Sequence, residues 1–346
     1  MIQGFPEEFH INTLPELLNT CAKECEKDMD MKSVFIALMN RLSSYLTDSG
    51  NVIENIEHGF SVYELFSTNI KELVKRSEAS EVKSTLNLYA AFLQFTLKCY
   101  PSKHEYVNDI LGDASNYCAS YDSNIDEDCQ MYIAKFLTTP LETMANIILT
   151  MDEYPRLIKY LKFKKKRDVA KNITKAIVRG NIDLTDEKMV SQVLTFIQPL
   201  LIKLPDYENV SDLLFKEEQV QVSKIVFYIN SEEVGVVWGI LKKFIDKFVE
   251  GGEERMQYTL PSTIFRLFQL AVQIYNNRDE STEPKVYKRV FDLCRNLIQR
   301  LTGHPKLSIR LYLELLMLIN VIDEEKFYDE YTYVIYLLFR TQPQIV

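Results

Sequence analysis

The chain has 346 residues, 47% of them apolar, with a formal net charge of −9 at pH 7, so it can bury a sizeable core and is not a disordered tail. The sequence pI near 5.2 lies far below the values typical of nucleic-acid-binding domains, and we expect no nucleic-acid partner. Only 10 Gly and 11 Pro occur while Leu, Ile, Lys and Glu are plentiful, a composition that favours helices over turn-rich sheets.

Helix start and stop signals recur along the chain. A hydroxyl residue followed three positions later by Glu predicts helix N-termini at Thr13, Ser102 and Thr139. Thr185 and Ser231 precede acidic residues that suit the positive end of a helix dipole, which predicts two further starts. Stops are predicted at four glycine positions: Gly50, Gly112, Gly180 with Asn181, and Gly251 with Gly252.

Between these signals the apolar residues keep helical spacing. In residues 232–249 a single buried stripe is expected to contain Val234, Trp238, Leu241, Ile245 and Phe248. About fifteen such helices follow one another without an alternating strand pattern or a hairpin dipeptide. Because a HEAT-type helical pair takes about 40 to 47 residues, roughly eight pairs fit into the chain. The pattern predicts an all-α fold, an α-solenoid of HEAT-like helical pairs wound as a right-handed superhelix.

Nothing in the sequence marks a second domain, so residues 1–346 are expected to form a single solenoid segment. Solenoids normally carry polar capping repeats, yet this chain is apolar near both ends. We therefore expect a piece of a longer solenoid, truncated at both ends.

The cysteine pattern and the most apolar stretch bear on the compartment. Six Cys are irregularly placed, which favours a reducing compartment, cytosol or nucleus, over a disulfide framework. Residues 311–322 are strongly apolar but contain Glu314 and are too short to span a bilayer, so any membrane contact is expected to be peripheral. Cys21 and Cys25 lie one helical turn apart, but without a second ligand pair they favour a structural role over a metal site.

The sequence contains no recognisable catalytic constellation. It has no Gly-x-Ser-x-Gly elbow, no phosphate-binding Gly-rich loop and no zinc-binding His pattern, and its four His residues are isolated from one another. Near the N-terminus, Phe5 and Phe9 are expected to pack while Glu7 and Glu8 stay solvated around His10. We predict a non-enzymatic protein with no catalytic residues, metal site or cofactor.

One strongly basic segment stands out. Between Arg156 and Arg179 there are ten basic residues and one acidic residue, Asp168, which leaves the rest of the chain with a charge of −18. On a helix, Val169, Ala170, Ile173, Ala176 and Ile177 fall on one face and Lys166 points near it, while most basic side chains fall opposite. The candidate partner-binding residues on the opposite face are Lys164, Lys165, Arg167, Lys171, Lys175 and Arg179.

Four interpretations of this basic face are open. They are a solvated surface, a dock for an acidic protein segment, a contact with anionic lipid headgroups, and a nucleic-acid site, the last disfavoured by the acidic pI. On this face, charge reversal at Lys171 is expected to leave stability unchanged, whereas Ile173→Asp would bury a charge and destabilise the fold.

Four strings carry a family resemblance: QGFPEEFHINTLPELLNTCA at 3–22, FIALMNRL at 35–42, LKCYPSKHEYVNDIL at 97–111 and RMQYTLPSTIFRLFQLA at 255–271. In this order they resemble the middle portion of the large retromer subunit, the vacuolar protein sorting-associated protein 35 family. The resemblance implies an α-solenoid scaffold that bridges an arrestin-like subunit and a metallophosphoesterase-fold subunit. The segments that carry these two docking ends are not expected within the chain.

The resemblance also implies a place in the cell. Retromer works with sorting nexins on the cytoplasmic side of endosomes, binds cargo tails, and retrieves transmembrane cargo to the Golgi or the plasma membrane. The function it implies is a non-enzymatic scaffold segment, peripheral on the endosome membrane through the complex. The alternative is a generic helical-repeat adaptor of another transport or coat complex.

Overall fold

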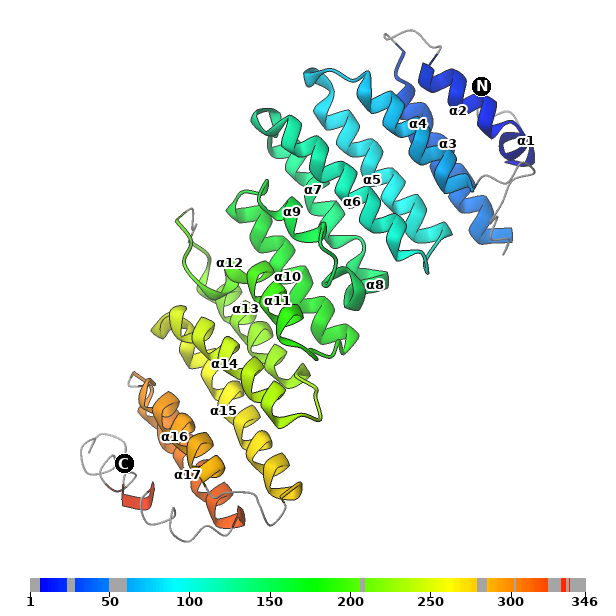
Figure 1. Cartoon of the computed structure of the whole chain (residues 1–346). Helices are drawn as coiled ribbons and strands as arrows, with labels where there is room; N and C mark the ends of the chain where they lie inside the picture. The colour runs from blue at the N-terminus through cyan, green and yellow to red at the C-terminus, as the bar shows by residue number, and fades with distance from the viewer. Residues whose placement is uncertain are drawn as a thin grey trace. The chain divides into compact units, whose positions relative to one another are not determined.

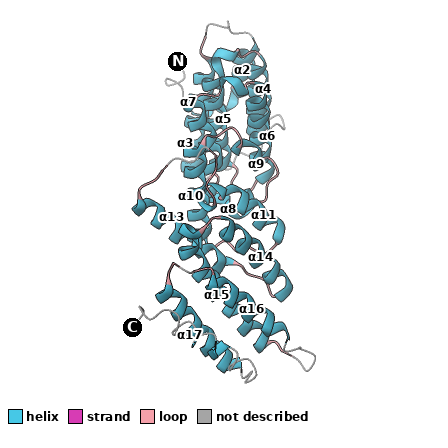
Figure 2. Ribbon diagram, turned by 90° about the vertical axis from the view of Figure 1, so that its left-hand side faces the viewer, coloured by secondary structure: helices cyan, strands magenta, loops and turns pink. Residues whose placement is uncertain are grey.

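The computed structural model describes residues 7–23, 29–49, 61–205, 209–278, 285–301, 303–322, 331–333 and 336. In this part of the chain every regular element is a helix (Figure 2). One isolated parallel bridge joins Leu184 and Ile229. The chain divides into two compact units, Met1–Val169 and Ala170–Val346, and each unit has its own buried apolar core.

The described part of the first unit consists of α-helices and two short 3-10 helices. Its elements are α1 (Glu7–Asn12), α2 (Leu14–Lys23), α3 (Met31–Ser49), α4 (Val62–Lys75), η2 (Ala79–Glu81), α5 (Val82–Cys99), α6 (His104–Ser120), η3 (Asp122–Asn124), α7 (Glu127–Thr138), α8 (Leu141–Ile148), α9 (Tyr154–Ile158) and the start of α10 (Phe163–Gly180).

Alternate helices of the first unit lie side by side. α3 packs on α5 and α5 packs on α7, while α2 packs on α4 in the other row, and α5 also contacts α4 and α6 (Figure 1). This arrangement of stacked helical pairs in two rows is that of an α-solenoid, because each pair buries its apolar faces against the pairs beside it. The all-α solenoid prediction is confirmed.

Aromatic side chains bind the two rows together. Phe66 of α4 is fully buried, and its ring centroid lies 6.2 Å from that of Phe35 in α3 and 5.2 Å from that of Phe95 in α5. Tyr63, one turn earlier on α4, stacks on Phe92 at 5.3 Å. Truncating a buried Phe typically costs about 3 to 5 kcal/mol, so Phe66 is a principal contact between the rows.

The second unit repeats the two-row arrangement. α14 packs on α11 and α15, α15 packs on α13, α16 and α17, and α16 packs on α17. Its elements are the remainder of α10, α11 (Glu187–Phe196), α12 (Gln198–Leu201), α13 (Asp212–Lys224), η4 (Ile225–Tyr228), α14 (Val234–Glu250), α15 (Glu253–Asn276), α16 (Lys285–Gln299) and α17 (Pro305–Ile322).

Two buried arginines of α15 anchor it to neighbouring backbone. Arg255 donates from Nε to the carbonyl oxygen of Leu200 at 3.2 Å, and Arg266 donates from Nη2 to the carbonyl oxygen of Ile229 at 2.9 Å. Arg255 also lies over the ring of Phe215 in α13, 5.2 Å from its centroid. Since burying an unpaired charge is costly, these bonds let α15 keep cationic side chains in its packed face.

The predicted helix starts are only partly correct. α2 begins directly after Thr13, as predicted. α6 begins at His104, but Ser102 does not cap it with its side chain. α8 begins after Pro140, and Thr139 is the C-cap of α7 instead of the N-cap of α8. α11 is capped one residue later than predicted: the carboxylate of Asp186 accepts from the backbone N–H of Met189 at 2.9 Å. A carboxylate at the N-cap also gains from the helix dipole.

The remaining predicted start and the predicted stops are also only partly correct. Ser231 lies two residues before the Glu233 N-cap of α14 and accepts its backbone N–H at 3.2 Å. The stops at Gly180–Asn181 and Gly251–Gly252 are confirmed, and Asn181 and Gly252 both adopt positive φ. The stop at Gly112 is wrong because α6 continues through it on buried residues either side, and Gly50 lies outside the described residues.

Two predicted packing surfaces also shift. In α14, Leu241, Ile245 and Phe248 are buried as predicted, but Val234 and Trp238 are half-buried, and Val237, Ile240 and Phe244 complete the buried face instead. In α1, Phe9 is 46% exposed while His10 is only 3% exposed, because this six-residue helix turns its other side towards α2 and α3. Phe5 lies outside the described residues.

Candidate functional site

The described residues contain no group of three or more His, Cys, Asp or Glu side chains placed to hold a metal ion. His10, His104 and His304 belong to α1, α6 and the turn before α17, and His58 is outside the described residues.

Cys99, Cys118 and Cys129 are not activated nucleophiles. Cys118 of α6 and Cys129 of α7 are buried, and burial raises the pKa of Cys118 to about 12 and that of Cys129 to about 11. Burial likewise raises the pKa of Cys99 to about 11. Because the thiolate is the reactive form, these thiols stay protonated and inert near neutral pH. Cys21 is buried in α2, and Cys25 lies outside the described residues.

α10 carries the basic segment from Lys164 to Arg179, and the packed face of this helix is the one that the periodicity predicts. Val169, Ala170, Ile173 and Ile177 are buried, and Ala176 is half-buried at the edge of the same face. Thr174, which the periodicity did not single out, is also buried and donates from its hydroxyl to the carbonyl oxygen of Ala170 at 2.9 Å. This bond satisfies the polar group of a residue on the packed face.

The basic side chains differ more from one another than the sequence suggested. Lys164, at the start of α10 in the first unit, is exposed, and so are Lys175 and Arg179 in the second unit. The other three candidate partner-binding residues, Lys165, Arg167 and Lys171, are half-buried, as is Lys166. The basic face is therefore not uniformly exposed, because long basic side chains lay their apolar stems along neighbouring surface.

Lys171 has an acidic neighbour within its own unit. Its Nζ lies 3.7 Å from Oε1 of Glu218 in α13, and Glu218 is only 8% exposed. A carboxylate this buried depends on nearby positive charge, so Lys171 contributes to the fold as well as to the surface charge. The sequence gave no local signal for this pair because the two residues are on separate helices.

Comparison with known proteins identifies the family. The family model described as vacuolar protein sorting-associated protein 35 matches residues 1–340. This chain belongs to the vacuolar protein sorting-associated protein 35 family. Vacuolar protein sorting-associated protein 35A of Arabidopsis thaliana is 26% identical over 355 aligned residues, which cover 99% of this chain and 44% of the relative. The Dictyostelium discoideum relative of the same family name is 27% identical, covering 91% of this chain and 42% of that protein.

The chain thus spans less than half the length of these curated relatives of the vacuolar protein sorting-associated protein 35 family. A solved designed circular tandem repeat protein aligns with 97% of the chain and 90% of its own length, but at 10% identity and a TM-score of 0.36 it supports no argument. In the ranges that the structure covers, no helix combines the length and apolar character needed to cross a bilayer.

The strings that carry the family resemblance are largely structural. FIALMNRL lies in α3, where Phe35, Leu38, Met39 and Leu42 are buried, and RMQYTLPSTIFRLFQLA lies in α15. These two strings therefore contribute mainly to the packed core of the solenoid.

Proposed function

We propose that this chain is a non-enzymatic scaffold segment of retromer. It would hold the other retromer subunits at a fixed separation and thereby support the retrieval of transmembrane cargo from endosomes to the Golgi and the plasma membrane. The observation that carries the proposal is the family match across residues 1–340. The two-row packing of helices in each unit supports it, since stacked repeats form extended structures suited to holding partners apart.

The partners proposed for the complex are the arrestin-like and metallophosphoesterase-fold subunits, the sorting nexins and cargo tails. Association with the endosome membrane would be peripheral and would occur through the complex. The exposed basic residues of α10, Lys164, Lys175 and Arg179, support a dock for an acidic segment of one of these proteins.

The test is capture of purified retromer subunits and sorting nexins by the immobilised chain at low and moderate salt. The test variant reverses three lysines, Lys164→Glu, Lys165→Glu and Lys175→Glu, and leaves Lys171 in place because of its contact with Glu218. The charge-matched control reverses Lys103, Lys224 and Lys242, which are exposed on other helices or turns.

Capture of at least one retromer subunit supports the scaffold proposal, and failure to capture any of them, even by a longer chain that includes both docking ends, would favour the generic adaptor. Capture that weakens with salt, disappears in the test variant and persists in the control supports the basic dock. Equal capture by the unchanged chain, the test variant and the control variant would indicate that the basic face of α10 is a solvated surface.

A further inference from the structure

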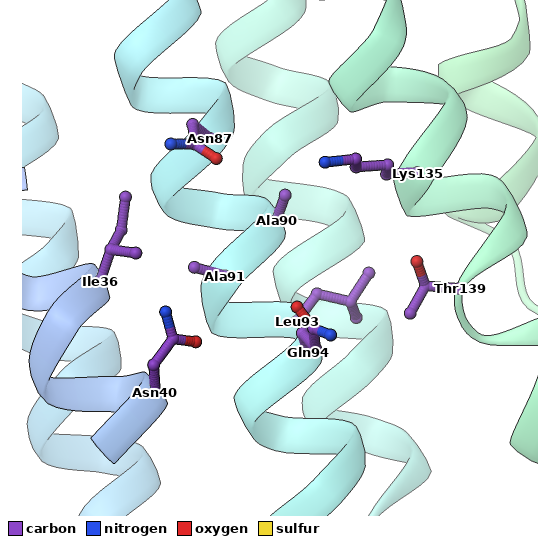
Figure 3. Close-up of a pocket in the computed structure, with 9 residues that line it drawn as sticks. All are labelled: Ile36, Asn40, Asn87, Ala90, Ala91, Leu93, Gln94, Lys135 and Thr139. Carbon is purple, nitrogen blue, oxygen red and sulfur yellow. The ribbon is translucent and has the colours of Figure 1, made fainter. Parts of the chain in front are cut away.

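A polar cavity opens on the row formed by α3, α5 and α7 in the first unit (Figure 3). Its volume is about 270 Å³, room for about nine water molecules. The side chains come from all three helices and the C-cap of α7, and they converge on the space between them. The lining residues are Ile36, Asn40, Asn87, Ala90, Ala91, Leu93, Gln94, Lys135 and Thr139.

Three carboxamides dominate this lining. Asn40 comes from α3, and Asn87 and Gln94 lie two turns apart on α5. Asn40 and Gln94 are exposed and Asn87 is half-buried, and among the described residues none of these three side chains makes a hydrogen bond within the protein. Fully buried amides, by contrast, are bonded within the protein. Gln219, for example, donates to the carbonyl oxygen of Leu200 at 2.8 Å, and Gln130 accepts from the N–H of Lys162 at 3.0 Å.

The cavity has one charged group, Lys135 of α7, whose side chain extends towards α5 (Figure 3). Lys135 is exposed, and within the described part of the chain it forms no ion pair. Its Nζ lies 5.3 Å from the ring centroid of Tyr132, one turn earlier on the same helix. The lining therefore presents a single positive charge, no carboxylate, and amides that can each donate and accept.

We propose that this cavity, the amide groove, binds a short extended peptide segment that carries one carboxylate. The peptide groups of an extended chain alternate donors and acceptors, and each carboxamide of Asn40, Asn87 or Gln94 can satisfy both. The carboxylate pairs with the ammonium of Lys135. The chain as a whole carries −9, so the match is to one carboxylate among neutral residues and not to a polyacidic segment.

The dimensions of the groove agree with this ligand. Asn87 and Gln94 are seven residues apart on α5, a rise of about 10.5 Å, which is the length of about three residues of extended chain. Ala90 and Ala91 lie between them and, because their side chains are small, leave space for the peptide backbone.

Other ligand classes fit less well. An amphipathic helix needs apolar anchor sites. The lining has only two large apolar residues, Ile36 and Leu93, and Leu93 is buried in the core with 1% of its surface exposed, so little of it can contact a ligand. Small-molecule sites are usually enclosed and mostly apolar, whereas Asn40, Gln94 and Lys135 are exposed at the groove. This proposal is independent of the retromer assignment, because it rests on the groove alone.

The experiment is a selection of binders from a displayed library of random 12-residue peptides against the whole chain. Peptides retained by a groove variant, Asn40→Ala with Asn87→Ala and Lys135→Glu, are removed in a counter-selection. The remaining peptides are synthesised and their dissociation constants measured by fluorescence anisotropy. We expect them to share one Asp or Glu and to bind Lys135→Glu at least about tenfold more weakly, the loss typical of a charge-assisted hydrogen bond.

Matched variants identify the groove as the site. Lys103→Glu and Asn116→Ala make the same chemical changes at exposed positions off the groove and are expected to leave affinity unchanged. Ala91→Phe fills the cavity and is expected to abolish binding, and thermal melting verifies that each variant is folded. A peptide with Lys in place of its acidic residue is expected to recover binding to Lys135→Glu.

Three results would overturn the proposal: no peptide enriched over the groove variant, enriched peptides that are amphipathic helices without an acidic residue, or binding that Lys135→Glu and Ala91→Phe leave unchanged. None of these results would bear on capture of retromer subunits, so the two proposals fail separately.

Discussion

Charge reversal at Lys171 tests the structural role of the basic helix. From its place on the charged face alone, Lys171→Glu is expected to be neutral, but the structure places its Nζ 3.7 Å from the carboxylate of Glu218, which is only 8% exposed. At an effective dielectric constant of about 20, two unit charges at this distance interact by roughly 4 kcal/mol before desolvation is subtracted. Lys171 is itself about one-third exposed, so solvent screens part of this energy.

We expect Lys171→Met to lower the free energy of unfolding by about 1 to 2 kcal/mol, because it leaves a buried carboxylate without this cation. Lys171→Glu adds repulsion, and we expect a loss of about 2 to 4 kcal/mol. The measurement is urea unfolding followed by circular dichroism, with the midpoints compared at constant slope.

Lys175→Glu, one turn further along α10 and exposed, is the matched control and is expected to shift the free energy by less than about 0.5 kcal/mol. The double variant Lys171→Glu with Glu218→Lys restores opposite charges and is expected to recover part of the loss. If Lys171→Glu and Lys175→Glu unfolded at the same urea concentration, the assignment of Lys171 as the buried carboxylate's partner would be refuted.

Three further predictions concern buried groups. Ile173→Asp places a charge on the buried face of α10 and is expected to lower the free energy of unfolding, measured with urea, by at least about 3 kcal/mol. A loss as small as that of Lys175→Glu would contradict the assignment of Ile173 to the buried face. Arg255→Met removes a donor to the Leu200 carbonyl oxygen and is expected to lower the free energy of unfolding, measured with urea, by about 1 to 3 kcal/mol, whereas an unchanged free energy would argue against the bond. Burial raises the pKa of Cys118 from 9.0 to about 12, so above pH 9 the unfolded chain loses the thiol proton while the folded chain keeps it. The free energy of unfolding is therefore expected to fall between pH 9 and 12, and to fall less steeply in Cys118→Ala.

The helical architecture could be predicted from the sequence because its signals are local. Apolar spacing within one helix records which side meets the core, and it placed Ile173 and Ile177 of α10 correctly. The same reasoning placed Leu241, Ile245 and Phe248 of α14 correctly, but it missed the rest of the buried face and included Trp238, which is half-buried. A helix of a two-row solenoid contacts several neighbours, as α14 contacts α11 and α15, so its buried face is broader than a single stripe.

Helix boundaries were less predictable because several polar residues compete at each end. Thr185 and Asp186 are adjacent, and both can cap α11, but the Asp carboxylate makes the bond. The glycine signal likewise depends on context. Gly251 and Gly252 end α14, since Gly252 adopts φ of 83°, whereas Gly112 stays helical inside α6. A glycine marks a stop only where the packing on either side allows the helix to end.

The surface sites were the hardest features to predict from the sequence, because in a solenoid the residues of one site come from several helices. Lys171 and Glu218 lie on α10 and α13, and the amide groove draws Asn40, Gln94 and Lys135 from three helices of one row. No motif within a single helix marks either arrangement. Alternate helices of the row are neighbours, so such a site appears only when polar positions on α3, α5 and α7 are compared at matched height. For a repeat protein, the register between alternate helices is therefore the information needed to predict a binding surface.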